Sequence, residues 1–353
     1  MPTFHTLRVA AVERLTDDAV AVTLDVPPEL RAAYGYEPGQ HIALRRPGED
    51  GAGVRRTYSL CDPASPEPAR LRIGIRRVEG GAFSTYAVKE MAPGDLLEVL
   101  PPTGRFVLKP RAGRYAAVVG GSGITPVLSI ASTLLLGEPE ARFCLLRGDR
   151  TAASTMFLDE VADLKDRFPD RFQLVTALSR EEQQSGLPSG RLDEERLSAL
   201  LPALLPEPES VDGWFLCGPL GLVEGASRAL RGLGVPRSRI HQEIFHAEEL
   251  PREPSAPVDT PDSATVTATL DGRSGNWPVQ DGESVLETVL RHRADAPFAC
   301  KGGVCGTCRV RLLDGEVRMD RNYALEPEEV DAGYVLACQS HPVTPAVTVD
   351  FDA

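Results

Sequence analysis

The sequence predicts a multidomain chain, in which an antiparallel β-barrel is followed by a doubly wound α/β domain and a small α+β domain. Three observations lead to this prediction. Short apolar segments bounded by glycine and proline fill residues 1–110, strand-like and helix-like segments alternate over 111–247, and a proline-rich stretch at 248–262 precedes the final region, 263–353. At roughly 100–200 residues per domain, 353 residues suffice for two or three domains with separate cores.

The first region is expected to be a barrel or sandwich of short strands. Alternating apolar residues and turn residues place these strands at 6–12, 20–26, 41–44, 56–60, 71–78 and 96–100. One helix interrupts them, because Phe83, Ala87 and Met91 recur near helical spacing after Gly80-Gly81.

The second region alternates strands and helices, which is typical of a parallel sheet covered on both faces. Strands are expected at 115–119, 143–147, 172–178 and 213–217, and helices at 125–136, 156–168, 193–201 and 220–233. Residues 248–262 lack apolar periodicity and are predicted to form a semi-extended linker. Beyond the linker, Asp271-Gly272 predicts a hairpin turn, and Ser284-Val285-Leu286-Glu287 is a capping box that opens a short helix.

The composition excludes several classes of function. A net charge of −13, from 38 basic and 51 acidic residues, argues against a nucleic-acid or anionic-membrane partner. No apolar run approaches the roughly 18–20 residues that cross a bilayer, and the first residues show no export signal, so we expect a cytoplasmic protein. Seven cysteines, an odd number, fit a reducing compartment better than a disulfide scaffold.

Four of the seven cysteines crowd into the last region. Their pattern is Cys300-x4-Cys305-x2-Cys308, with Cys338 following after 29 residues, which is the spacing of plant-type [2Fe–2S] ligands. The cluster needs four thiolates in total, and the glycines of this loop allow it to fold tightly with N–H groups toward the sulfurs. A structural zinc site, which usually takes paired two-residue spacings, and simple buried cysteines are the alternatives.

Two segments of the first region suit a ligand with a diphosphate and an apolar ring. Arg56-Thr57-Tyr58-Ser59 lies on a predicted strand, where alternation puts Arg56 and Tyr58 on one face. Gly80-Gly81-Ala82-Phe83-Ser84 opens the predicted helix, whose free N–H groups form an anion site together with the Ser84 hydroxyl. A half-exposed strand and an N-capped surface helix are the ordinary explanations of these segments.

The second region offers a glycine-rich turn and two strand ends that suit a nucleotide. In Gly120-Gly121-Ser122-Gly123-Ile124-Thr125-Pro126 the glycines allow a pyrophosphate to approach, although Pro126 stands at the third glycine position of the dinucleotide fingerprint. Cys217-Gly218-Pro219 and Ser179-Arg180 end strands at the edge where open sheets bind ligands, and Arg180 is placed to hold a ribose 2′-phosphate and so select NADPH. A bland turn, a buried structural cysteine and an exposed arginine are the alternatives.

Together these segments resemble, in their order along the chain, the ferredoxin–NADP reductase superfamily, and residues 300–309 resemble a plant-type ferredoxin. The combination covers nearly the whole chain and is similar to oxygenase reductases whose ferredoxin domain comes last. Residues 315–320, 322–325 and 338–342 are most similar to the reductase subunits of phenylacetyl-CoA epoxidases, with the 3-ketosteroid 9α-hydroxylase reductases as the neighbouring group.

The resemblance implies a flavin-binding barrel, an NAD(P)-binding domain and a β-grasp-like [2Fe–2S] domain. It implies that Ser59 and Cys217 are catalytic, with Ser59 near the reactive flavin N5 and Cys217 beside the path of the hydride. The cofactor-binding residues expected from the motifs and the resemblance are Arg56, Tyr58, Ser59, Gly81, Ser84, Gly121, Gly123, Thr125, Ser179, Arg180 and Phe245. The cluster ligands expected are Cys300, Cys305, Cys308 and Cys338.

The chain departs from the family pattern at two places. Thr57 stands where the family often has cysteine, which we expect to be harmless. Arg147-Gly148-Asp149-Arg150 stands where a Tyr-Gly-Asn-Arg-like strand end is usual, which leaves contacts in the nucleotide pocket open.

The resulting hypothesis is an electron relay from NADPH through FAD and a [2Fe–2S] cluster to an oxygenase, expected to be di-iron and multisubunit. Spacing does not separate FAD from FMN, and the resemblance favours FAD. A non-enzymatic iron–sulfur redox sensor or carrier, and a general reductase that serves metabolism, are the alternatives. Residues 263–353 hold 14 acidic and 8 basic side chains, so their net charge of −6 favours a partner with a basic docking patch.

Overall fold

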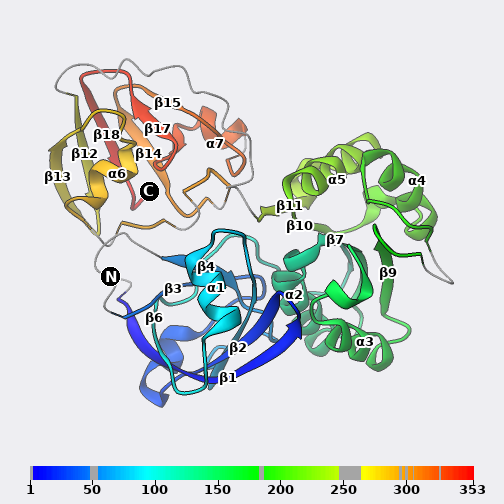
Figure 1. Cartoon of the computed structure of the whole chain (residues 1–353). Coiled ribbons are helices and arrows are strands. Elements are labelled where there is room, and N and C mark those ends of the chain that lie inside the picture. Colours follow the sequence, from blue (N-terminus) through cyan, green and yellow to red (C-terminus); the bar gives the residue numbers. More distant parts are fainter. Residues whose placement is uncertain are drawn as a thin grey trace. The chain divides into compact units, whose positions relative to one another are not determined.

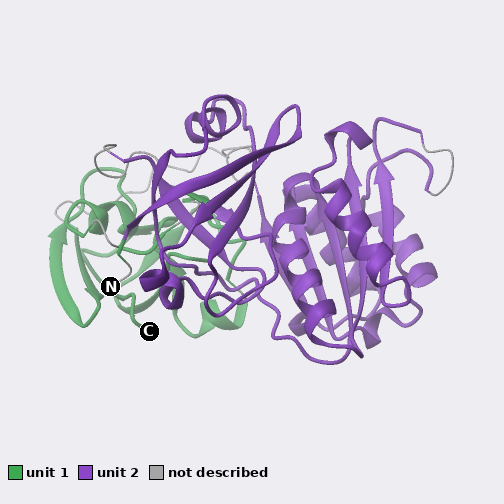
Figure 2. Cartoon of the chain, turned by 90° about the horizontal axis from the view of Figure 1, so that it is seen from below, with its two compact units in different colours: residues 1–3, 48–57, 247–353 green, residues 4–47, 58–246 purple. Residues whose placement is uncertain are grey.

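The computed structural model describes residues 3–47, 55–182, 187–245, 264–293, 296–298, 301–304, 306–325 and 327–353. The predicted linker at 248–262 and two predicted cluster ligands, Cys300 and Cys305, lie outside the described residues. The chain divides into two compact units (Figure 2): residues 1–3, 48–57 and 247–353 form one, and residues 4–47 and 58–246 form the other.

The predicted antiparallel barrel is confirmed (Figure 1). Its six strands follow the order β4-β3-β6-β1-β2-β5, and a bridge between Leu60 and Ile73 joins the segment after β4 to β5. Both residues are fully buried, so closure also builds the core. The strands are β1 (His5–Thr16), β2 (Ala19–Asp25), β3 (His41–Arg45), β4 (Arg56–Ser59), β5 (Arg70–Arg76) and β6 (Leu96–Val99).

Strand β1 extends four residues beyond the strand predicted at 6–12. Its pairing with β2 shifts register between Val9 and Ala11 and again between Arg14 and Thr16. Each shift inserts a residue that breaks the alternation of buried and exposed side chains, so a pattern of period two ends before the strand does. The predicted helix forms as α1 (Ala82–Lys89).

The parallel α/β sheet is also confirmed, with strand order β11-β10-β7-β8-β9 and parallel pairing throughout. The chain steps from β7 to β8 and β9 in one direction, then crosses back to β10 and β11 on the other side. Right-handed crossovers therefore put helices on both faces, as Figure 2 shows. The strands are β7 (Arg114–Gly120), β8 (Arg142–Asp149), β9 (Phe172–Leu178), β10 (Gly213–Gly218) and β11 (Ile240–Ile244).

The helices of this sheet are α2 (Ile124–Gly137), α3 (Leu158–Arg167), α4 (Glu194–Leu204) and α5 (Leu220–Gly232). Helix α3 starts two residues later than predicted, because Phe157 adopts a left-handed conformation with φ of 54°. That turn buries the phenyl ring against the barrel, where a side chain at Gly74 would meet it. A tertiary contact thus overrides the helical pattern.

The C-terminal region folds into a five-stranded sheet, ordered β13-β12-β18-β14-β16, and a two-stranded sheet of β15 and β17. The predicted hairpin is confirmed: Asp271 and Gly272 both have positive φ, as a tight two-residue turn requires. The capping box of Ser284 and Glu287 is present at α6. The elements are β12 (Thr265–Leu270), β13 (Arg273–Pro278), α6 (Val285–Leu290), β14 (Arg309–Asp314), β15 (Val317–Met319), α7 (Pro327–Asp331), β16 (Tyr334–Leu336), β17 (Ser340–Pro342) and β18 (Ala346–Asp350).

Among the residues that the structure describes, no helix has the length and apolar character needed to cross a membrane.

Candidate functional site

The order of the parallel strands reverses direction between the neighbouring strands β7 and β10. The connection from β7 leads to β8 on one side, whereas β10 lies on the other side and connects onward to β11. Such a switch in direction leaves a crevice outside the strand ends, and open α/β sheets bind their ligands there. The glycine-rich turn after β7 and Cys217 near the end of β10 both lie at this edge of the sheet.

Two glycines are required for the backbone of the turn to pass close to β10. A Cβ atom on Gly123 would lie 2.2 Å from the carbonyl oxygen of Cys217, and Gly121 has a φ of +56°. Gly123 is the N-cap of α2, and no side chain caps that helix. Thr125 is buried and its hydroxyl donates to the Ser122 carbonyl at 3.0 Å. The predicted nucleotide residues of this turn therefore form a tight loop at an uncapped helix start, which suits a pyrophosphate.

A carboxylate that the sequence did not reveal joins the two predicted catalytic residues. Ser59 of β4 donates its hydroxyl to Glu243 Oε2 at 3.5 Å, and the Cys217 thiol lies 4.0 Å from the same oxygen. The other carboxylate oxygen, Oε1, is 3.9 Å from Nδ1 of His41. The four residues come from β4, β10, β11 and β3, so the fold of one compact unit brings them together.

This group of four is shielded from water. Ser59 is 4% exposed, Cys217 is fully buried, and the side chains of His41 and Glu243 are 5% and 11% exposed. Burial, and then the nearby charge of Glu243, raises the pKa of the Cys217 thiol well above its ordinary value. Both effects therefore favour the neutral thiol of Cys217 over the nucleophilic thiolate.

Only weak signals pointed to Glu243 and His41 in the sequence. Glu243 lies on β11, where the polar residues 241–243 stand between two isoleucines. The pattern of apolar residues did not predict this strand. Nearby, the Phe245 N–H donates to the Gly218 carbonyl at 2.9 Å, and His241 stacks on Phe215 with ring centroids 4.9 Å apart. Burial lowers the pKa of His241, so its ring is neutral in this stack.

The predicted flavin segments form an aromatic surface and an uncapped helix start. The rings of Tyr58 and Phe83 lie 5.8 Å apart. Gly81 is the N-cap of α1 and offers no capping side chain, so the first-turn N–H groups suit a diphosphate. The Ser84 hydroxyl donates to the Gly81 carbonyl at 3.3 Å and accepts from the Val78 N–H at 3.1 Å, so it also fixes this turn.

These groups fit a flavin dinucleotide. An aromatic ring, a buried hydroxyl and an uncapped helix start correspond to its ring system, its polar edge and its pyrophosphate. Arg56, at the start of β4, has an exposed side chain that donates through Nη1 to the Arg55 carbonyl at 3.0 Å, and a guanidinium has five N–H donors, so it can also donate to a phosphate.

Ser179 and Arg180, which follow β9, lie beside the end of β8. The Ser179 N–H donates to the Asp149 carbonyl at 2.9 Å, and the Arg180 N–H donates to the Arg150 carbonyl at 2.9 Å. Both arginine side chains are exposed. The two guanidinium groups thus belong to neighbouring backbone positions, an arrangement suited to an anionic group.

The departure at Arg147-Gly148-Asp149-Arg150 produces a buried ion pair. Arg147 and Asp149 side chains are each 2% exposed, with Nε and Oδ2 2.9 Å apart, and Arg147 also donates to the Met156 carbonyl at 3.0 Å. Within the described residues, Arg147 Nη1 and Asp149 Oδ1 have no hydrogen-bond partner. The pair therefore holds the loop after β8 from inside the protein, while Arg150 remains at the surface.

Two of the four predicted cluster ligands are described, and both are buried. Cys308 is 2% exposed and Cys338 is 9% exposed. The N–H of Ala337, which precedes Cys338, donates to the Cys308 carbonyl at 3.0 Å, so the two cysteine segments are adjacent. The loop before Cys308 has positive φ at Lys301, Gly303 and Gly306, and two buried cysteines on adjacent segments fit a [2Fe–2S] centre.

Three domain families match the chain in order along it. They are described as an oxidoreductase FAD-binding domain (residues 6–108), an oxidoreductase NAD-binding domain (118–228) and a 2Fe-2S iron-sulfur cluster binding domain (268–343).

Full-length relatives share this arrangement. The chain is 45% identical over 357 residues to one of the subunits of the 1,2-phenylacetyl-CoA epoxidase of Escherichia coli K12, covering 100% of this chain and 99% of the relative. It is 34% identical to the ferredoxin reductase component of the 3-ketosteroid-9-alpha-monooxygenase of Rhodococcus rhodochrous, covering 98% and 96%.

Solved structures agree. Phthalate dioxygenase reductase matches with a TM-score of 0.60 and 25% identity over 99% of this chain and 98% of its own. An intact type IV self-sufficient cytochrome P450 monooxygenase matches with a TM-score of 0.68 and 27% identity, covering 98% of this chain and 41% of the larger protein.

Proposed function

The chain belongs to the oxygenase reductase components that are built from FAD-binding, NAD-binding and [2Fe–2S] domains, and from this premise we propose that its partner is a phenylacetyl-CoA epoxidase. It is an NAD(P)H-dependent oxidoreductase that transfers electrons through FAD and a [2Fe–2S] cluster to an oxygenase. The observation that carries the proposed partner is 45% identity across the full length of a component of such an epoxidase. A 3-ketosteroid hydroxylase is the second candidate, supported by 34% identity over 98% of this chain.

The site residues support different roles for bound FAD and for the side chains of the reductase unit, which comprises residues 4–47 and 58–246. Bound FAD supplies the conversion of a two-electron hydride into single electrons, which a [2Fe–2S] centre can accept. With FAD bound, Ser59 would orient the polar edge of the ring system, and the neutral thiol of Cys217 would exclude water from the hydride path. Glu243, whose Oε2 accepts from the Ser59 hydroxyl, would be the nearby carboxylate able to accept a proton.

Cofactor contacts elsewhere follow from the two uncapped helix starts. We assign the flavin diphosphate to Arg56, Gly81 and Ser84, and the ring to Tyr58 and Phe245. We assign the nicotinamide nucleotide to the turn of Gly121, Gly123 and Thr125. The assignments at the helix starts rest on N–H donors and a close approach of the backbone. Those of Arg56, Tyr58 and Phe245 rest on side-chain chemistry and on the resemblance.

NADPH is the proposed electron donor. Ser179 and Arg180 end β9 next to Arg150, so a hydroxyl and two guanidinium groups are available where the ribose 2′-phosphate of NADPH would lie. A bidentate guanidinium contact favours a phosphate over the hydroxyl that NADH carries.

We propose that the oxygenase is a multisubunit di-iron enzyme in the cytoplasm with a basic docking patch. This patch would match residues 263–353, whose 14 acidic and 8 basic side chains leave a charge of −6. The proposed domains are 1–110 for flavin, 111–247 for the nucleotide and 263–353 for the cluster, with a linker at 248–262. Cys300 and Cys305 complete the proposed ligand set with Cys308 and Cys338.

Reconstitution tests the partner. The purified chain, NADPH and a phenylacetyl-CoA epoxidase oxygenase should give NADPH-dependent epoxidation of phenylacetyl-CoA, with a 3-ketosteroid hydroxylase oxygenase as the parallel reaction. Turnover only with the steroid system would overturn the epoxidase assignment and favour the second candidate. If neither oxygenase gives turnover while NADPH still bleaches the flavin, the partner is a different oxygenase and both candidates are wrong.

A further inference from the structure

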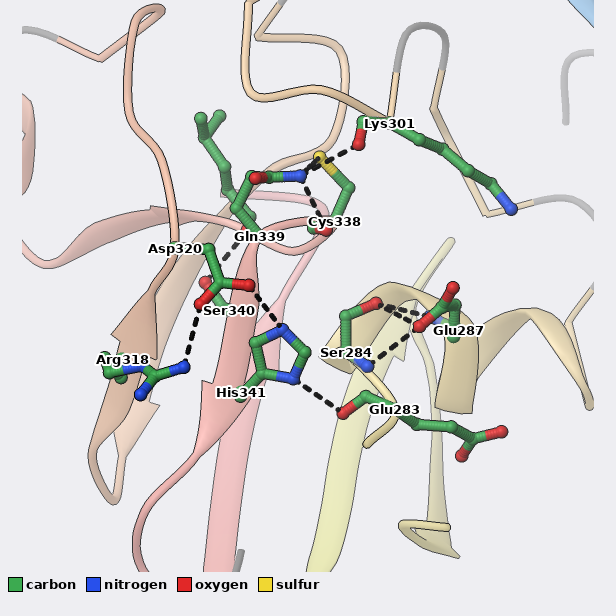
Figure 3. Close-up of polar contacts among 11 residues, drawn as sticks. Glu283, Ser284, Glu287, Lys301, Arg318, Asp320, Cys338, Gln339, Ser340 and His341 are labelled. Atoms are coloured by element: carbon green, nitrogen blue, oxygen red, sulfur yellow. Dashed lines mark hydrogen bonds and ion pairs between the residues drawn. The ribbon is translucent and has the colours of Figure 1, made fainter. Parts of the chain in front are cut away.

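The side chain of Gln339 lies between two segments of the cluster region (Figure 3). Its amide nitrogen, Nε2, is 2.8 Å from the Lys301 carbonyl oxygen, 3.0 Å from the Cys338 carbonyl oxygen and 3.6 Å from the Cys338 sulfur. Gln339 is 9% exposed, so the amide is held away from bulk water. One donor group thus reaches both the residue after Cys300 and the sulfur of Cys338.

The chemistry of the amide suits a thiolate. A primary amide nitrogen carries two N–H bonds and no charge, so it donates without titrating itself. With three acceptors in reach, the Cys338 sulfur shares an N–H with one of the two carbonyl oxygens. A thiolate accepts more strongly than a thiol, because hydrogen bonds to charged acceptors are the stronger ones. The contact between Gln339 and Cys338 is therefore stabilised when Cys338 is a metal ligand.

The backbone fixes the amide in place. The Gln339 N–H donates to the Leu336 carbonyl at 2.9 Å, and the Gln339 carbonyl accepts from the Asp320 N–H at 2.8 Å. The absence of a side chain at Gly303 leaves room for the glutamine, because a Cβ there would lie 3.1 Å from Gln339 Cγ. Because the main chain of Gln339 is already fixed, little further conformational entropy is lost when its amide binds the sulfur.

The residues that follow Gln339 anchor strand β17, which begins at Ser340. His341 of β17 lies 3.2 Å from Asp320 through Nε2 and 3.2 Å from the Glu283 carbonyl oxygen through Nδ1, and Arg318 donates to Asp320 at 2.9 Å (Figure 3). These contacts tie β17 to β15 and to the start of α6. These contacts hold the strand that directly follows Gln339 and so restrain the position of Gln339.

We propose that Gln339 is a positioning residue that raises the reduction potential of the [2Fe–2S] centre through its N–H contact with the Cys338 sulfur. The inference rests on the proposed assignment of Cys338 as a ligand. A donor directed at a ligand sulfur stabilises the form with the greater negative charge, which is the reduced form. The second contact, to Lys301, holds the loop that carries the other ligands against the same sulfur.

Two variants separate the hydrogen bond from packing. Gln339→Leu removes the donor and keeps comparable bulk, and Gln339→Glu keeps the shape but replaces the amide N–H donors with a carboxylate oxygen. Gln280→Leu is the matched control, because Gln280 is exposed in the same region and donates to Glu283 through its backbone N–H, which the substitution retains.

The potential is measured by anaerobic titration of the full-length protein with redox mediators, followed by EPR of the cluster, without NADPH or oxygenase. Both Gln339 variants should lower the equilibrium constant for one-electron reduction about tenfold, which corresponds to a fall of about 59 mV. The Gln280 control should match the wild type. An unchanged potential in Gln339→Glu would reduce the role of Gln339 to packing and overturn the proposal.

A measurement on the wild-type protein tests the proposal even if the Gln339 variants fail to assemble a cluster. With ¹⁵N in the glutamine side-chain amides, pulsed EPR of the reduced protein should show a nitrogen coupling that the Gln280→Leu control retains. No such coupling would equally overturn the proposal. A wild-type protein without any cluster signal would instead contradict the proposed function, so the two failures are distinguishable.

Discussion

In the proposed function, the reductase unit (residues 4–47 and 58–246) and the cluster region (residues 263–353) use cysteine sulfur in opposite chemical states. In the reductase unit, burial and the nearby carboxylate of Glu243 raise the pKa of the Cys217 thiol and so favour its protonated form. In the cluster region, the amide of Gln339 points donor N–H bonds toward the Cys338 sulfur, which suits a thiolate.

The difference follows from what each region transfers. Hydride transfer requires two ring systems at contact distance, so a neutral, compact thiol that excludes water serves better than a charged one. A [2Fe–2S] centre accepts single electrons at metal ions, whose ligand sulfurs must be deprotonated and whose potential responds to nearby donors. The same side chain is thus assigned its role by its neighbours.

The largest expected effect comes from removing a cluster ligand. Cys308→Ser should lower cytochrome c reduction by about 100-fold or more, because one-electron acceptors depend on the cluster. Ferricyanide reduction by the flavin should persist. Steady-state assays with both acceptors measure this, and equal loss of both activities would show that the two regions are not functionally separable.

Glu243→Gln tests the opposite region. The variant preserves the shape of the side chain but removes the charge beside Ser59 and Cys217, so the rate of flavin reduction by NADPH should fall by about 100-fold. Anaerobic stopped-flow absorbance measures that rate. The exposed Glu140→Gln variant is the control, and a rate for Glu243→Gln within twofold of this control would remove the carboxylate from the mechanism.

Arg180→Ala addresses the selection of the nucleotide by the reductase unit. Losing a charged hydrogen bond of about 1.5–3 kcal/mol should raise the KM for NADPH at least tenfold, and leave the KM for NADH nearly unchanged. Steady-state kinetics with both nucleotides measure the ratio. Equal changes for both would remove Arg180 as the ligand of the 2′-phosphate, and the cluster potential should not respond in either case.

The smallest effect concerns the protonated sulfurs and appears at alkaline pH. Burial raises the pKa of the Cys144 thiol to about 12, so in the folded state it stays protonated while the unfolded thiol ionises. The free energy of unfolding should therefore fall by up to about 1.4 kcal/mol per pH unit between the ordinary thiol pKa and about 12.

Urea unfolding of the wild type and of Cys144→Ala at pH 7.5 and 9.5 measures this slope. The variant should lose a constant amount of stability from the smaller side chain and should show a shallower dependence on pH. Identical slopes for the two proteins would show that Cys144 ionises as readily in the folded state as in the unfolded state.

Local patterns were sufficient for most of the fold. The strand at 172–178, the hairpin turn at Asp271-Gly272 and the capping box at Ser284 follow the sequence closely, because turn geometry and side-chain period act within a few residues. The extension of β1 and the late start of α3 did not follow from the sequence pattern. The register shifts of β1 and the burial of Phe157 both depend on contacts with other strands.

The sequence by itself determined the order of the domains, the cofactor motifs and the cysteine spacing, since each is encoded in neighbouring residues. Only the tertiary structure brought Glu243 and His41 to Ser59, and Gln339 to Lys301. Glu243 is 184 positions from Ser59 and lies on a short strand without a clear apolar pattern, so only a weak local signal marks it. Contacts between distant segments are decided by how strands pair and cross over, and this pairing sets which groups surround Cys217 and Cys338.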